Sequence, residues 1–187
     1  MRRHPLARGL ATRYSNPVNS KHFVEFPDPV NEISARLVAG GVVILCLVAI
    51  VSGQSWLTLV IAYGFLARVL TGPTLSPLGQ FVTRVLTPRI GKAPRYVPGP
   101  PKRFAQGIGA VLSVSAAVLA VGFGLQVIAD TLLAAIIVAA TLESVAGFCL
   151  GCTIFGGLMR IGVIPQEVCL RCANLNFDTP VGSQTRP

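Results

Sequence analysis

Charged residues are scarce in this chain, and acidic residues are the scarcest of these. Asp, Glu, Lys and Arg together make up 12% of the 187 residues, against about 25% in an average soluble domain. Hydrophobic residues account for 52% of the chain. A composition so poor in charge and so rich in apolar residues argues against a soluble domain and predicts an integral membrane protein.

Other common features are also missing. Residues 1–34 contain no apolar run, so we expect no secretory signal peptide. The two histidines, His4 and His22, precede the first apolar segment, which leaves the spans without a histidine ligand for haem or metal. Basic residues are not interleaved with aromatic residues, and this argues against nucleic-acid binding.

Four long apolar segments are present instead, and they predict an all-α integral membrane protein. About 20 apolar residues cross a bilayer, so each segment suits one transmembrane helix. The expected spans are 35–53, 54–70, 105–128 and 131–157. Short links within the first and the last pair predict two helical hairpins. The four-helix domain would occupy residues 35–159, between an N-terminal tail at 1–34 and a C-terminal tail at 160–187.

The segment between the second and third spans differs in composition. Residues 71–104 are rich in proline and basic residues and contain no acidic residue. Because prolines at this density disfavour one continuous helix, we predict a basic loop on the membrane surface, with a short amphipathic helix at Leu78–Leu86.

Basic residues predict the orientation. All 16 Lys and Arg fall in the two tails, in the central loop, or at the span ends nearest to them. The positive-inside rule places these regions, and both termini, on the cytoplasmic side. We therefore expect a multi-pass protein of the bacterial cytoplasmic membrane. The Arg-rich stretch Met1–Tyr14 fits a cytoplasmic tail, although a transit peptide or an interfacial segment has the same composition.

Two charges lie inside the predicted spans. Arg68 and Glu143 are at similar depth, each roughly 20 Å from the outer ends of their helices at 1.5 Å per residue. A lone ion in the membrane costs several kcal/mol, which favours an ion pair between them. Snorkelling of Arg68 and protonation of Glu143 are the alternatives.

Four of the five cysteines form two Cys-x-x-Cys pairs. Cys149 and Cys152 fall near the cytoplasmic end of the fourth predicted span, and Cys169 and Cys172 fall in the C-terminal tail. The spacing suits a four-cysteine metal site, and paired motifs also suit thiol exchange, for which Arg160 and Arg171 would supply positive charge. A permanent disulfide is disfavoured in the cytoplasm. The remaining alternative is that the four cysteines stay reduced and share no role.

Several stretches together resemble a known family. They are "GPTLSPLGQF" (Gly72–Phe81), "GPPKRFAQGIG" (Gly99–Gly109), "GFCLGC" (Gly147–Cys152) and "CLRC" (Cys169–Cys172). In these the chain is similar, over about Asp28 to Leu175, to the bacterial membrane family Domain of Unknown Function 4395. Relatives in that family tend to occur beside, or fused to, thioredoxin-like and sulfur-transfer proteins. The resemblance therefore implies thiol or sulfur chemistry with a separate partner chain.

The family stretch also contains Lys102, Arg103, Phe104 and Gln106. Their simpler interpretation is an interface anchor, with cations at lipid phosphates and Phe104 at the headgroup boundary. The more specific interpretation is a binding surface for an anionic ligand or a partner.

The leading hypothesis is thus a membrane thiol-redox or sulfur-relay component that works with a thioredoxin-like partner. In that reading Cys149, Cys152, Cys169 and Cys172 carry the chemistry. The alternative is a non-catalytic membrane subunit whose four cysteines hold zinc or an iron–sulfur cluster structurally; its partner would then be a larger membrane complex. Neither reading identifies the protein as an enzyme.

Overall fold

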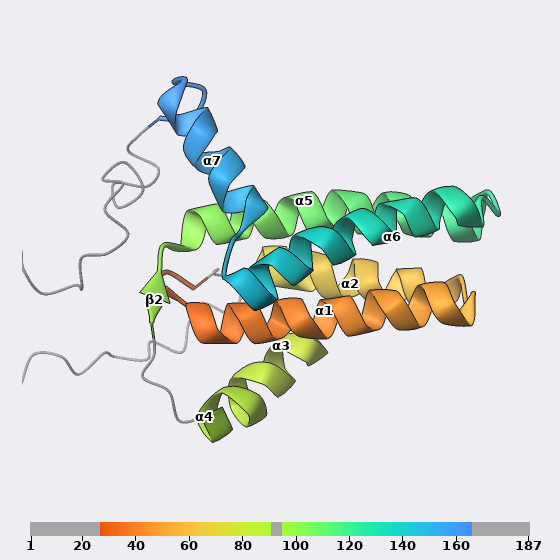
Figure 1. The fold of residues 1–187 in the computed structure, drawn as a ribbon, viewed down its shortest axis with the longest axis horizontal. Coiled ribbons are helices and arrows are strands. Elements are labelled where there is room, and N and C mark those ends of the chain that lie inside the picture. Colours follow the sequence, from red (N-terminus) through yellow and green to blue (C-terminus); the bar gives the residue numbers. More distant parts are fainter. Residues whose placement is uncertain (1–26, 91–94, 166–187) are drawn as a thin grey trace, which may run out of the picture.

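The structure is a computed structural model that describes residues 27–90 and 95–165. Most of these residues are helical, and four long helices run side by side as a bundle (Figure 1). Their bounds are α1 Glu32–Ser52, α2 Trp56–Thr71, α5 Gly99–Ala117 with η3 Val118–Gly122, and α6 Gln126–Thr141 with η4 Leu142–Ala146. The segments η3 and η4 are π-helical turns that continue the helix before them.

Three of these helices are long and apolar enough to cross a bilayer. They are Glu32–Ser52, Gly99–Gly122 and Gln126–Ala146, whereas α2 is a shorter apolar helix of 16 residues. Large apolar side chains remain exposed along them, among them Val51, Val111 and Val127. Apolar surface on this scale is rare on a soluble monomer and is expected where helices contact lipid. The predicted membrane protein is therefore supported.

The helices meet in a core of small and aliphatic side chains. Cys46 on α1, Ala116 on α5, and Ala129 and Leu133 on α6 are fully buried. Small residues allow close approach of helices. Gly109 on α5 faces Phe65 on α2 so closely that an added Cβ would lie 2.2 Å from the ring. Cys46 thus acts as a small apolar core residue.

The predicted bounds of the last two spans were wrong. The link between them is Phe123–Leu125 rather than 129–130, because Gly124 takes a left-handed conformation with φ +68° and ends the helix there. The third helix also starts earlier, at Gly99, where Pro100 and Pro101 occupy first-turn positions that need no N–H donor. The short link after α1, at Gly53–Ser55, is close to the prediction.

The basic segment between α2 and α5 contains a helix, as predicted, but a longer one. It consists of α3 Pro77–Phe81, η2 Val82–Leu86 and α4 Thr87–Ile90, and it lies against α1 (Figure 1). Two short strands then tie the start of α1 to the start of α5. Strand β1, Val30–Asn31, pairs antiparallel with β2, Tyr96–Val97, with Val30 opposite Val97.

The fourth predicted span is not one helix up to residue 157. The helix ends at Ala146, because Gly147 adopts a left-handed φ of +69° and stops it. A separate helix, α7 Leu150–Arg160, follows and leaves the bundle at a steep angle beside the start of α5 (Figure 1). The break separates Glu143 from the two cysteines, which the sequence had placed on one continuous helix.

Candidate functional site

Glu143 has a basic partner, but it is not the predicted one. Its Oε1 lies 2.5 Å from the Nζ of Lys102, and the two side chains are only 15% and 11% exposed. Lys102 belongs to the first turn of α5 and Glu143 to η4, so the ion pair joins the two helices beside the break at Gly147. A buried carboxylate in this position requires such a partner.

Arg68 is buried and forms hydrogen bonds with neutral side chains instead. Its Nε donates to Oε1 of Gln106 at 3.0 Å, and its Nη1 donates to Oγ of Ser76 at 3.3 Å. Its guanidinium also lies over the Phe65 ring, 4.5 Å from the ring centroid, in a cation–π contact. Within the described part of the chain Arg68 forms no ion pair, so the predicted Arg68–Glu143 ion pair is wrong. The reason is that Lys102 lies inside the bundle and forms the ion pair with Glu143.

The partners of Glu143 and Arg68 both come from one face of α5. Lys102 and Gln106 are four residues apart, and such residues share a helix face. Lys102 reaches Glu143, and Gln106 reaches Arg68. Phe104 packs on Phe155 of α7 with ring centroids 5.6 Å apart. Of the predicted interface run, Arg103 is the exposed member, and its Nε donates to the Val69 carbonyl at 3.1 Å. The anchor interpretation therefore fits Arg103 and not Lys102 or Gln106.

The break after η4 is stabilised by Arg36, a residue for which the sequence predicted no role. The Nε of Arg36 on α1 donates to the Ser144 carbonyl at 3.2 Å, and its Nη2 donates to the Val145 carbonyl at 2.7 Å. A guanidinium stabilises a helix C-terminus because it satisfies free carbonyls and opposes the helix dipole. The signal available in the sequence was an arginine in the first turn of an apolar span.

Cys149 and Cys152 form a close pair at the start of α7. Cys149 is the N-cap residue, and its Sγ accepts from the backbone N–H of Cys152 at 3.3 Å. The thiol of Cys152 donates to the same sulfur, with the two Sγ atoms 2.6 Å apart. Both cysteines are free thiols. The pair thus sits at the positive end of a helix dipole, where a thiolate is stabilised.

The two thiols differ in acidity. The hydrogen bond from Cys152 lowers the pKa of the Cys149 thiol, and the positive charge of Lys102 acts in the same direction, against burial and the charge of Glu143. Donating that hydrogen bond raises the pKa of Cys152, and burial raises it further. Cys149 is therefore the thiol that ionises first, and nucleophilic attack requires the thiolate.

The charge beside the thiols comes from Lys102 and not from Arg160. Arg160 ends α7, eight residues beyond Cys152, which corresponds to about 12 Å along a helix. Arg171 and the second pair, Cys169 and Cys172, lie outside the described residues. Within residues 27–90 and 95–165 no three metal-ligating side chains cluster together.

Comparison with known proteins assigns the chain to a family. The family model described as a domain of unknown function (DUF4395) matches residues 30–160. The chain belongs to the DUF4395 family. The matched region contains Lys102, Glu143, Cys149 and Cys152, and it ends before the second cysteine pair, which the sequence resemblance had included. Beyond DUF4395, no curated protein and no solved structure matches the chain.

Proposed function

We propose that this DUF4395 protein is a membrane-bound thiol-redox or sulfur-relay component in which Cys149 is the attacking thiol and Cys152 the resolving thiol. The observation that carries the proposal is the pair itself. One sulfur receives two hydrogen bonds at a helix N-terminus, and the second thiol lies 2.6 Å away. Lys102 and Glu143 adjoin this pair, and their charges act on both thiols.

The redox step follows thiol–disulfide exchange. The Cys149 thiolate attacks one sulfur of a partner disulfide, forms a mixed disulfide and releases the other partner sulfur as a thiolate. Cys152 then loses its proton and attacks Cys149. A Cys149–Cys152 disulfide forms, and the partner leaves as a dithiol. Two electrons pass from this chain to the partner, and the reverse sequence would reduce the pair.

A sulfur relay uses the same residues. The Cys149 thiolate would accept a sulfane sulfur from a donor persulfide and become a persulfide itself, while the donor regains its thiol. Cys152 would then attack the inner sulfur and release hydrosulfide, leaving a disulfide. The partner in either version is a thioredoxin-like or sulfur-transfer protein, as the family resemblance implies. Cys169 and Cys172 would act as a second pair that exchanges with the first.

The proposed setting is the bacterial cytoplasmic membrane with four spans, α2 included, and both termini in the cytoplasm. Support comes from the ends of the bundle. The links at Gly53–Ser55 and Phe123–Leu125 lie together at one end, and neither contains Lys or Arg (Figure 1). Lys102, Arg36 and Arg68 lie toward the other end, with the thiols. A reporter fused to the C-terminus should be active only on the cytoplasmic side; activity outside would reverse the orientation.

The alternative is a structural site for zinc or an iron–sulfur cluster made by all four cysteines, and their sequence spacing favours it. Two thiolates on one tetrahedral zinc, with Zn–S bonds of about 2.3 Å, would be roughly 3.8 Å apart. The Cys149 and Cys152 sulfurs are closer, at 2.6 Å, so they would have to move apart to bind one zinc.

Trapping of the mixed disulfide tests the thiol proposal. A Cys152→Ser variant lacks the resolving thiol, so it should accumulate a partner covalently bound through Cys149. Cys149→Ser is the matched control and should trap nothing. Equal trapping by both variants, or trapping by neither in cells that contain thioredoxin-like proteins, would contradict the assigned roles.

A further inference from the structure

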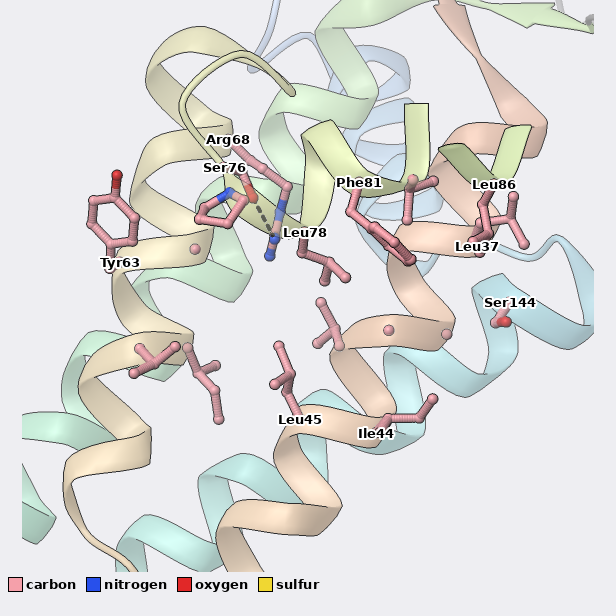
Figure 2. A pocket seen from close by; sticks show the side chains of 18 residues that line it. Leu37, Ile44, Leu45, Tyr63, Arg68, Ser76, Leu78, Phe81, Leu86 and Ser144 are labelled. Carbon is pink, nitrogen blue, oxygen red and sulfur yellow. Dashed lines mark hydrogen bonds between the residues drawn. The ribbon is translucent and has the colours of Figure 1, made fainter. Parts of the chain in front are cut away.

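A cavity of about 730 Å³ lies between α1 and α2, away from the thiols (Figure 2). The two helices form one hairpin but separate here, because α1 packs mainly on α6 and α2 mainly on α5. The short helix α3–η2 forms the third wall. Cavities of this size are typical of sites for organic ligands.

The walls are apolar and fixed in place. Leu45 on α1, Ile61 on α2 and Leu78 on α3 line the cavity. The third wall is held against α1, since Leu78 approaches Gly41 so closely that an added Cβ would lie 2.7 Å from Leu78 Cδ1. Val82 on η2 is also almost fully buried.

The mouth of the cavity opens through exposed apolar side chains. Ile44 on α1, Val60 on α2 and Phe81 on α3 line it and are 64%, 43% and 53% exposed. Ile44 and Val60 lie within apolar helices, so this opening faces the hydrocarbon of a bilayer rather than water. A ligand would therefore enter from the membrane.

Among the described residues that line this apolar space, one is a cation. Arg68 is only 6% exposed, and its guanidinium points into the cavity next to Ser76 (Figure 2). The two described partners of its side chain, Gln106 and Ser76, are both neutral. A guanidinium has five N–H donors. Donors therefore remain for an anion, and a buried charge without a counter-ion is costly.

We propose that the cavity holds one acyl chain of an anionic phospholipid, with the headgroup phosphate on Arg68. The chain would lie along Leu45, Ile61 and Leu78, and the phosphate would accept from the guanidinium and neutralise it. The depth is suitable, since Arg68 is three residues from the end of α2. A small water-soluble anion would leave the apolar walls empty, and a lipid without a phosphate would leave Arg68 without a counter-ion.

Lipid retention by the purified full chain tests this proposal. The protein is delipidated in detergent, and native mass spectrometry measures its binding of phosphatidylglycerol and of diacylglycerol, which lacks the phosphate, with identical acyl chains. Charge-assisted hydrogen bonds predict a preference of about tenfold or more for phosphatidylglycerol. Inorganic phosphate in millimolar excess should not displace the lipid; if it does, the site is one for small anions.

Two pairs of variants locate the site. Arg68→Gln should abolish the preference for phosphatidylglycerol, whereas Arg103→Gln, which removes an exposed charge from the same end of the bundle, should keep it. Leu45→Trp fills the cavity and should reduce the retention of both lipids. Leu47→Trp adds the same bulk to an exposed position on α1 that does not line the cavity, and should leave retention unchanged.

Several outcomes would overturn the proposal. Equal binding of the two lipids by the native chain would show annular lipid only. If Arg68→Gln and Arg103→Gln lose the preference for phosphatidylglycerol equally, the lipid is attracted by the general positive charge of the protein surface and not by one site. If Arg68→Gln does not fold, the comparison of Leu45→Trp with Leu47→Trp tests the site. Unchanged lipid retention in Leu45→Trp would exclude the cavity as the lipid site. The proposal does not depend on the thiol chemistry, and a failure of either leaves the other standing.

Discussion

Lys102 on α5 and Glu143 on η4 form an ion pair, with Nζ and Oε1 2.5 Å apart, at the place where the chain leaves the bundle and starts α7. The pair has two consequences. It holds the end of η4 against the start of α5, and it places two opposite charges that act on Cys149 and Cys152. The helix break and the dithiol are therefore parts of one local structure.

Substitutions of Lys102 and Glu143 should have strongly coupled effects on the free energy of unfolding. Lys102→Met leaves the Glu143 carboxylate buried without a partner, which costs about 3–5 kcal/mol. Adding Glu143→Gln removes that charge and should restore most of the loss. Thermal unfolding in detergent measures the effect, with exposed Arg103→Met as the control of small effect. Additive losses in the double variant would show that the two side chains do not depend on each other.

The two thiols should react at different pH values. Because its pKa is lowered, Cys149 should be alkylated at a lower pH than an ordinary thiol, and Cys152, whose pKa is raised, only at a higher pH. Peptide mapping after timed alkylation with iodoacetamide measures both rates. Faster modification of Cys152 than of Cys149 at neutral pH would reverse the assigned roles.

A matched pair of variants tests the cause of this difference. Cys152→Ala removes the donor to Cys149, so the Cys149 pKa should rise and its alkylation at pH 7 should slow several-fold, since a change of one pKa unit alters the thiolate fraction about tenfold. Cys152→Ser keeps a hydroxyl donor and should retain most of the rate. If both variants react alike, the hydrogen bond is not what activates Cys149.

The sequence predicted the helical membrane class and the location of the short helix in the basic loop. These follow from composition and periodicity, which are local properties. It did not predict the end of α6–η4 at Gly147, because "VAGFCLGC" is apolar throughout and an apolar run does not show where a helix bends. The partners of Arg68 and Glu143 were missed for a related reason. The sequence around Lys102 is typical of a lysine at the membrane interface, and only the fold places this side chain inside, beside Glu143.

Packing of α7 on α5 should depend on one glycine. An added Cβ at Gly151 would lie 2.5 Å from the Ala105 Cα, so Gly151→Ala must push the helices apart and should lower the thermal midpoint. Gly157 has no neighbour within 4 Å of such a Cβ. Gly157→Ala should therefore stabilise by about 0.5–1 kcal/mol through helix propensity. A destabilised Gly157→Ala, or an unaffected Gly151→Ala, would show that α7 is packed differently.

Metal content measured together with the free-thiol count tests the central claim most directly. The full chain is purified under reducing conditions, its bound metal is measured, and its thiols are titrated before and after oxidation by a disulfide reagent. We predict no stoichiometric metal, reactive thiols at Cys149 and Cys152, and a reversible loss of at least two thiols, as these two form a disulfide. One zinc or one iron–sulfur cluster per chain, with all four thiolates of the two pairs protected, would contradict the account.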